Sequence, residues 1–206
     1  MSLVVEDLED QSKYRQILAI PYKDLVPFIF EYLRKKSGLL IFFWSVCFIF
    51  LSLVIRIRIN IAGNYPISQI FLHSFSGMIV IPILCIPFHE LLHIIPYVIS
   101  GAKRIRVGMD LKQYLFYVTA HRHVTKSLQF KIVALVPFIV ISLIFLFLIF
   151  YLPGLWKWTI SLFLFVHTTM CAGDFAMLNF YFLNRKKEIL TWDDAEEKIA
   201  YFYEEI

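Results

Sequence analysis

The sequence predicts an all-α membrane protein with about four transmembrane helices, the second long and Pro-broken, and a small cytoplasmic β-hairpin. Of its 206 residues, 59% are hydrophobic and 17% are charged, and the mean hydropathy is +0.69. A soluble domain is nearer half apolar and a quarter charged. A helix needs about 20 apolar residues to cross about 30 Å of hydrocarbon. Four runs of the chain are long enough: Leu39–Arg56, Ile67–Ser100, Phe130–Tyr151 and Trp156–Phe182.

Basic residues predict the orientation of these spans. Seventeen of the 20 Lys and Arg residues lie in the N-terminal segment, the middle loop and the C-terminal tail. Because cytoplasmic loops are enriched in Lys and Arg, both termini and the middle loop are expected in the cytoplasm of a multi-pass protein. The net charge of +4 is therefore a topology signal, and we see no nucleic-acid-binding patch. The sequence does not indicate an oligomeric state.

The chain divides into three parts. Residues 1–38 are predicted to be a cytosolic lead-in, and they show no cleavable signal peptide. This lead-in ends in an amphipathic helix over Tyr22–Lys36 that lies along the lipid headgroups. Residues 39–184 form the transmembrane core. Residues 185–206 are a charged cytosolic tail, in which Thr191–Asp194 resembles the start of a short helix, with a capping threonine and two acids in the first turn.

The second apolar run is too long for a simple crossing. Its 34 residues would measure about 50 Å as one straight helix. Pro82, Pro87 and Pro96 each lack a backbone N–H, so they are expected to bend or break it, and Pro87 could open a new helical segment. Backbone carbonyls freed in this way are tolerated where water or protein meets them. The run therefore offers a route for water into the membrane.

The remaining elements are simpler. In the middle loop, Arg104–Val107 alternates, Gly108–Asp110 can turn, and Tyr114–Thr119 is rich in strand formers, which predicts the hairpin. The third span carries Pro137 near its cytoplasmic end. The fourth follows after a very short connection at Pro153-Gly154, so the two should pack as an antiparallel pair.

The motif with the clearest chemistry is His89-Glu90-Leu91-Leu92-His93. It has the pattern H-E-x-x-H, in which two histidines one helical turn apart can reach one metal ion while the glutamate lies beside them. With six His in the chain, a chance match has a probability on the order of one in a hundred. The pattern therefore indicates a zinc hydrolase.

Asp174 is the candidate third ligand. Ionisable residues inside a bilayer are costly and usually functional, and Glu90 and Asp174 are the only acidic residues well inside the predicted spans. Counted from the cytoplasmic ends of their spans, His93 and Asp174 both lie roughly 12–15 Å deep at 1.5 Å per residue. Catalytic zinc commonly takes two histidines and one carboxylate. We therefore predict that His89, His93 and Asp174 bind Zn²⁺ and that Glu90 is the general base that activates a water.

Several residues near this set have open roles. Glu90 could instead be a buried, neutral acid. His167 could hold a zinc ligand through a hydrogen bond, bind the developing oxyanion, or be a core histidine. Asn179 could orient a substrate carbonyl or bond to a neighbouring span. Cys85 and Cys171 lie one turn before His89 and Asp174 and could be metal ligands, but a buried free cysteine is usually a small hydrophobe.

With Phe88–His93 in one span and Cys171–Asp174 in a later one, the chain resembles the putative zincin peptidase family of small bacterial membrane proteins, which is similar to site-2 proteases. The resemblance covers most of residues 70–185. It implies that Asp174 is the distal zinc ligand and that the substrates are membrane-associated polypeptides, cut near the cytoplasmic side of a bacterial plasma membrane. An Asn, a Pro and a Leu before the aspartate in site-2 proteases have no counterpart here, where Ala172 and Gly173 precede Asp174. A substrate strand could add to the edge of the hairpin.

Three functions were weighed. The sequence favours a zinc-dependent intramembrane endopeptidase, because metal binding alone would not require Glu90. A non-catalytic zinc-binding membrane scaffold, or a transporter-associated protein, is the alternative. A metal-ion transporter would have polar residues spaced along a path through the membrane, whereas here they cluster at one level.

Overall fold

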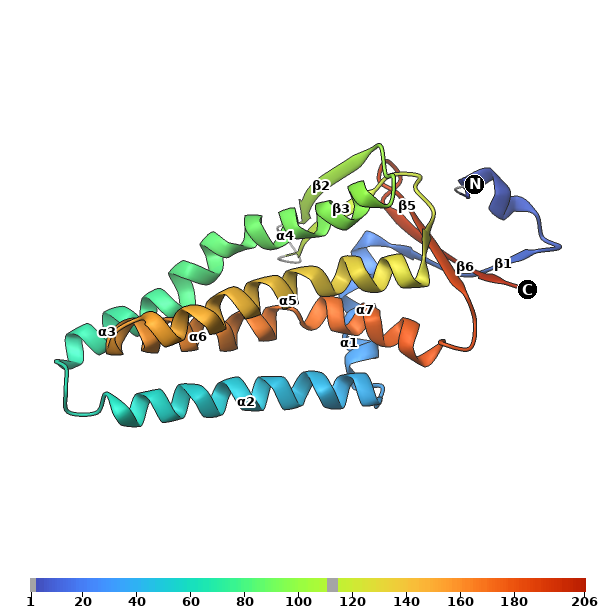
Figure 1. Ribbon diagram of the computed structural model, residues 1–206. Coiled ribbons are helices and arrows are strands. Elements are labelled where there is room, and N and C mark those ends of the chain that lie inside the picture. The colour runs from blue at the N-terminus through green and yellow to red at the C-terminus, as the bar shows by residue number, and fades with distance from the viewer. Residues whose placement is uncertain (1–2, 111–114) are drawn as a thin grey trace.

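The computed structural model describes residues 3–110 and 115–206 and is mostly helical (Figure 1). Two short 3₁₀ turns, η1 (Val5–Glu9) and η2 (Tyr22–Asp24), lie in the N-terminal segment. The longer helical elements are α1 (Leu25–Arg34), α2 (Gly38–Asn60), α3 (Ile67–Phe75), the π-helical segment η3 (Ser76–Val80), α4 (Ile81–Ile99), α5 (Ser127–Tyr151), α6 (Gly154–Met170) and α7 (Ala172–Leu183). Within the described residues, three helices are long and apolar enough to cross a membrane, or four if α6 and α7 form one bent span. These helices confirm the predicted apolar runs.

The second run differs from its prediction because it is not broken. Residues Ile67–Ile99 form one helix of 33 residues, and Pro87 and Pro96 lie inside α4. The irregularity comes earlier, at η3, and Pro82 lies in the first turn of α4 directly after it. A π-helical turn widens the helix, so it can accommodate the proline that follows. The expectation that Pro87 opens a new helical segment was therefore wrong.

Close packing of η3 against α6 holds this long helix in place. A Cβ added to Gly77 would lie 2.4 Å from the carbonyl oxygen of Thr159, so only glycine permits this approach. On the same face, the indole N–H of Trp158 donates to Ser74 Oγ at 2.9 Å, and His73 Nδ1 lies 2.7 Å from Thr159 Oγ1. The helix is thus fixed upstream of the H-E-x-x-H motif.

The fourth run is two helices. α6 ends at Met170, α7 begins at Ala172, and the two axes differ by 43°. Phe175 in the first turns of α7 packs against Phe43 of α2 and Phe138 of α5, with ring centroids 4.6 and 5.1 Å apart. The bend turns the start of α7, and Asp174 with it, into the bundle.

The prediction of an all-α protein with a single hairpin was incomplete. A four-stranded antiparallel sheet, in the order β1-β6-β5-β4, joins the two ends of the chain at one end of the helices (Figure 1). Its strands are β1 (Tyr14–Pro21), β4 (Thr125–Lys126), β5 (Ile189–Asp194) and β6 (Ile199–Glu205). The expected helix at Thr191 was wrong: Thr191 and Trp192 are paired with Phe202 and Tyr201 of β6. Threonine, tryptophan and tyrosine are strand formers, and cross-strand pairing outweighs the capping pattern.

The predicted hairpin is present as β2 (Ile105–Asp110) and β3 (Leu115–Ala120), which pair antiparallel. Gly108–Asp110, expected to turn, instead belongs to β2. Tyr114, which was expected to begin the second strand, lies outside the described residues.

Helix α1, at Leu25–Arg34, confirms the helix expected over Tyr22–Lys36 and is amphipathic. Its C-terminal end is held by Asn179 of α7, whose Nδ2 donates to the carbonyl oxygens of Tyr32 and Lys35, both at 2.8 Å. The lead-in is therefore attached to the helix that carries Asp174.

Candidate metal centre

Helix α4 supplies the H-E-x-x-H side chains. His89 and His93 are one turn apart, with ring centroids 5.0 Å apart, and side-chain atoms of His89, Glu90 and His93 that could bind a metal all lie within 4.8 Å of one another. Both histidines are largely buried, with 13% and 11% of their side chains exposed. The helical spacing therefore gathers the three groups as the sequence predicts.

A proline on the neighbouring helix orients His93. Pro137 lies inside α5 and has no backbone N–H, so the carbonyl of Val133, four residues earlier, loses its helical donor. That carbonyl oxygen accepts a hydrogen bond from His93 Nδ1 at 2.9 Å. Donation from Nδ1 leaves the lone pair of Nε2 free to bind a metal. Pro137 was noted in the sequence, but its role was missed because it depends on which helix lies beside α4.

Helix α7 brings Asp174 to the histidines. Asp174 lies in the first turn of α7, where unpaired backbone N–H groups and the helix dipole favour a negative charge. Its Oδ2 is 3.3 Å from His89 Nε2, and its Oδ1 is 3.6 Å from His93 Nε2. Each carboxylate oxygen thus faces one histidine.

These separations fit a metal ion. In a tetrahedral zinc site with bonds of 2.0–2.1 Å, two ligand atoms lie about 3.3 Å apart. The distances from His89 Nε2 and His93 Nε2 to the Asp174 oxygens are close to that value, and both Nε2 atoms are free to coordinate a metal. The donor set of two imidazoles and a carboxylate is also one that zinc prefers. By donor type His89, His93 and Asp174 suit Zn²⁺, but among the described residues this trio is not one of the groups whose ligand atoms all lie within 4.8 Å of one another, so the Asp174 carboxylate would have to shift for one ion to contact all three.

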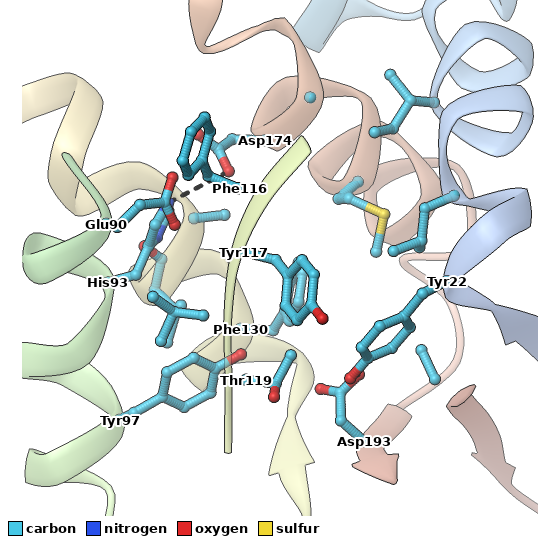
Figure 2. Close-up of a pocket in the computed structure, with 18 of the residues that line it drawn as sticks. Tyr22, Glu90, His93, Tyr97, Phe116, Tyr117, Thr119, Phe130, Asp174 and Asp193 are labelled. Atoms are coloured by element: carbon cyan, nitrogen blue, oxygen red, sulfur yellow. Dashed lines mark hydrogen bonds and ion pairs between the residues drawn. The ribbon is translucent and has the colours of Figure 1, made fainter. Parts of the chain in front are cut away.

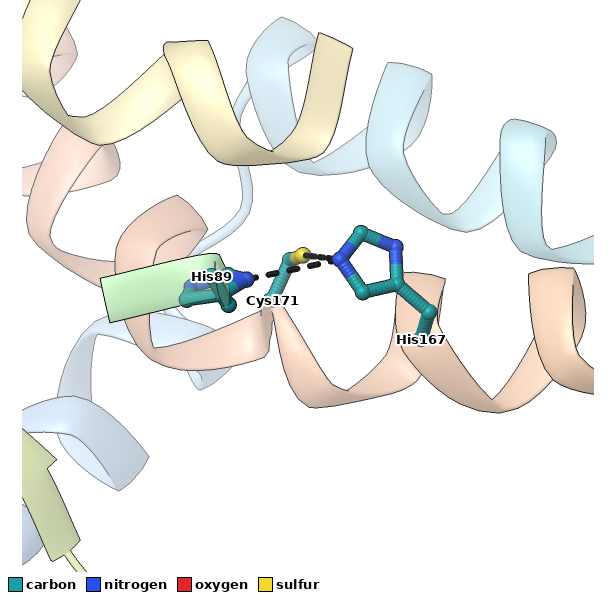
Figure 3. Close-up of side chains that lie close together, drawn as sticks. All are labelled: His89, His167 and Cys171. Atoms are coloured by element: carbon teal, nitrogen blue, oxygen red, sulfur yellow. Dashed lines mark hydrogen bonds between the residues drawn. The ribbon is translucent and has the colours of Figure 1, made fainter. Parts of the chain in front are cut away.

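His167 of α6 lies beside His89 (Figure 3). His167 Nε2 is 3.4 Å from His89 Nδ1 and 3.8 Å from Cys171 Sγ. The three side chains form a second group whose potential ligand atoms lie within 4.8 Å of one another. His89 uses a different nitrogen toward each group: Nε2 toward Asp174 and Nδ1 toward His167. A hydrogen bond from Nδ1 to His167 would fix the His89 ring, as the Val133 carbonyl fixes His93.

A cavity of about 490 Å³ extends from the H-E-x-x-H side chains and Asp174 to the four-stranded sheet. Glu90, His93 and Asp174 lie at one end (Figure 2). The Glu90 carboxylate makes no hydrogen bond or ion pair with any residue in the described ranges, and it lines the cavity. Water or a substrate in the cavity can therefore reach Glu90.

Asn179 and Cys85 lie outside this cavity lining. Asn179 is fully buried and bonds to α1 as described above. Cys85 is buried against Ile141 and Phe163 in an apolar cluster. Of the sequence candidates, the structure thus gathers His89, Glu90, His93, Asp174, His167 and Cys171, and leaves these two elsewhere.

The far end of the cavity carries polar residues that were not predicted. Asp193 of β5 and Tyr22 line it, and the Tyr22 hydroxyl donates to Asp193 Oδ1 at 3.3 Å (Figure 2). Burial raises the pKa of Asp193 from its ordinary value to about 7, and the Tyr22 hydrogen bond partly opposes this rise. The sequence shows Asp193 only as part of an acidic pair in the tail, so its burial could not be foreseen without the sheet.

The raised pKa of Asp193 predicts that the stability of the protein depends on pH. Because the pKa of Asp193 is higher in the folded protein than in the unfolded chain, the folded state binds more protons between about pH 4 and pH 7, so stability falls as pH rises through that range. From pH 5 to pH 8 this one group should lower the free energy of unfolding by about 2–3 kcal/mol. Denaturation of the purified protein across this range should show that loss, and Asp193→Asn should remove it. An unchanged pH slope in Asp193→Asn would contradict the assignment.

Zinc hydrolases typically have two histidines on one helix, a glutamate beside them and a third ligand from another element. In this helical protein with apolar, span-length helices, His89, Glu90 and His93 lie together and Asp174 of α7 lies beside both histidines. The chain belongs to the family described as putative zincin peptidase, whose model matches residues 82–190. The matched part contains the H-E-x-x-H motif and Asp174, and it ends before Asp193. No curated protein and no solved structure matches the chain.

Proposed function

We propose that this protein is a zinc-dependent intramembrane endopeptidase that hydrolyses peptide bonds of membrane-associated polypeptides near the cytoplasmic side. The observation that carries the proposal is the placement of the Asp174 carboxylate between His89 Nε2 and His93 Nε2, with Glu90 in the same cavity. Membership of a zincin peptidase family supports it. His89, His93 and Asp174 would hold the metal.

When bound, zinc supplies Lewis-acid chemistry, lowering the pKa of a water and polarising the carbonyl of the scissile bond. Glu90 holds that water by a hydrogen bond and accepts its proton on a carboxylate oxygen. The water oxygen adds to the carbonyl carbon, and as the C–N bond breaks the protonated Glu90 gives its proton to the departing amine nitrogen. Val133 and His167 keep the two imidazole rings in place, so that little reorganisation is needed during the reaction.

The cavity supports a polypeptide substrate. It is lined by Phe116–Thr119 of β3. His121 N donates to the Arg104 carbonyl oxygen at 2.8 Å, so the backbone groups of His121 point toward β2. In an antiparallel pair, the backbone groups of successive residues point alternately toward the partner strand and away from it. Those of Phe116 and Val118 therefore point away from β2, on the outer edge of β3. An extended substrate could pair with that edge and lie along the cavity toward Glu90.

The location in a membrane rests on three or four helices of span length and on their exposed apolar side chains, among them Ile41, Phe48, Phe71, Ile83 and Phe147. Strand β1 pairs with β6, so the two ends of the chain lie at the same end of the helices, which suits an even number of crossings. The basic residues favour the cytoplasm for this end. The partners are then the lipid bilayer and the substrate.

The test is cleavage of membrane-inserted peptides by the purified protein, comparing wild type with Glu90→Gln. Zinc content is measured on the same samples, so that loss of the reaction is separated from loss of the metal.

A further inference from the structure

The end of the cavity away from Glu90 is built like a binding site. Asp193, Tyr22 and Thr119 face one another there (Figure 2). Thr119 is 6% exposed, and its Oγ1 lies near the Tyr22 hydroxyl but makes no hydrogen bond of regular geometry with any described residue. A buried hydroxyl without a partner is unfavourable, so a polar ligand at this position would satisfy it.

Within residues 3–110 and 115–206, Asp193 has no basic partner. No Lys or Arg of the described ranges forms an ion pair with it, whereas the buried Glu204 in the next strand is paired with both Arg15 and Lys187. Only Oδ1 of Asp193 accepts a described side-chain hydrogen bond, from Tyr22. Asp193 is partly buried and lines the cavity, and burial accounts for its raised pKa. A cation that enters the cavity would supply the missing partner.

The distance between the two ends suits an extended peptide. Strand β3 lines the cavity from Phe116 to Thr119, and three residues of a strand span about 10 Å. All four residues line this cavity, and in the projection of Figure 2 Phe116 is drawn over Asp174 and Thr119 beside Asp193. When the scissile bond of a substrate alongside β3 is at Glu90, a substrate side chain about two to four residues along the peptide would therefore lie at Asp193.

We propose that Asp193 and Thr119 form a specificity site for a Lys or Arg side chain of the polypeptide substrate, on the cytoplasmic side of the cleaved bond. This inference rests on the proposed peptidase function. The ammonium or guanidinium group can donate to both the Asp193 carboxylate and Thr119 Oγ1. Membrane-spanning polypeptides carry Lys and Arg where they enter the cytoplasm, so such substrates would present a basic residue at this position.

Binding is tested on Glu90→Gln, so that the peptide is not consumed. The probe is a synthetic peptide with an apolar span of about 20 residues, followed by a Gln and Ser tail that carries one Lys near its start; its twin has Gln in place of that Lys. We expect Glu90→Gln to bind the Lys peptide about 10- to 100-fold more tightly than its twin. Adding Asp193→Asn should reduce the preference to about twofold or less, and Thr119→Val, which keeps the side-chain shape, should reduce it severalfold.

The matched control is Asp194→Asn on the neighbouring position of β5. Asp194 Oδ1 accepts hydrogen bonds from the backbone N–H groups of Glu196 and Glu197, which Asn can also do, so the preference for Lys should remain. Equal binding of the two peptides to Glu90→Gln, or a preference for Lys that survives both Asp193→Asn and Thr119→Val in folded protein, would overturn the proposal. If the wild type binds the Lys peptide preferentially but cleaves neither peptide, the binding site stands and the peptidase function fails.

Discussion

Replacing Glu90 with Gln should abolish peptide cleavage while zinc stays bound. Glutamine has nearly the same shape as glutamate but cannot accept a proton from water. General-base catalysis contributes about 10²- to 10⁴-fold to a rate, so the loss should lie in that range or above it. Cleavage of a membrane-inserted peptide, followed by mass spectrometry, measures the rate, and elemental analysis of the same protein measures the zinc.

Glu31→Gln is the control for this change. Glu31 lies on α1 and forms a surface ion pair with Lys35, outside the cavity lining. This variant should cleave at the wild-type rate. Cleavage by Glu90→Gln at an undiminished rate would show that Glu90 is not the base, and the mechanism would then be wrong.

Replacing Asp174 with Ala should remove most of the zinc. Changing a residue that only orients a metal ligand typically costs 10- to 100-fold in metal affinity, and the loss of one of three ligands should exceed about 100-fold. Competition with a chromogenic chelator measures the affinity. Asp24→Ala, at the exposed start of α1, makes the same chemical change away from the cavity and should leave the affinity as it is.

Wild-type zinc affinity in Asp174→Ala would mean that another residue completes the site. His167 would then be the first candidate, because it already lies 3.4 Å from His89.

The sequence predicted the apolar helices because the membrane imposes a simple rule on length and hydropathy. It also gave the pairing of the H-E-x-x-H motif with Asp174, since acidic residues inside spans are rare and depth can be counted along helices. The structure places Asp174 beside both histidines, as that count requires.

The four-stranded sheet was missed partly because β1 and β4 lie far along the chain from β5 and β6. The pairing of Tyr14–Pro21 with Ile199–Glu205 is contained in no local pattern. Ile189–Asp194 and Ile199–Glu205 form a local hairpin, which was missed because Thr191–Asp194 also fits a helix-capping pattern. The break at Cys171 and the hydrogen bond from His93 to the Val133 carbonyl were missed for a related reason. Both are set by packing between helices, which spacing along one helix does not reveal.

X-ray absorption at the zinc edge tests the central claim most directly, because His89 belongs to two possible ligand groups. If His89, His93 and Asp174 hold the ion, the spectrum of the purified wild-type protein should show only nitrogen and oxygen ligands, at about 2.0–2.1 Å. A sulfur ligand at about 2.3 Å would place zinc instead at His89, His167 and Cys171, and would contradict the proposed active site.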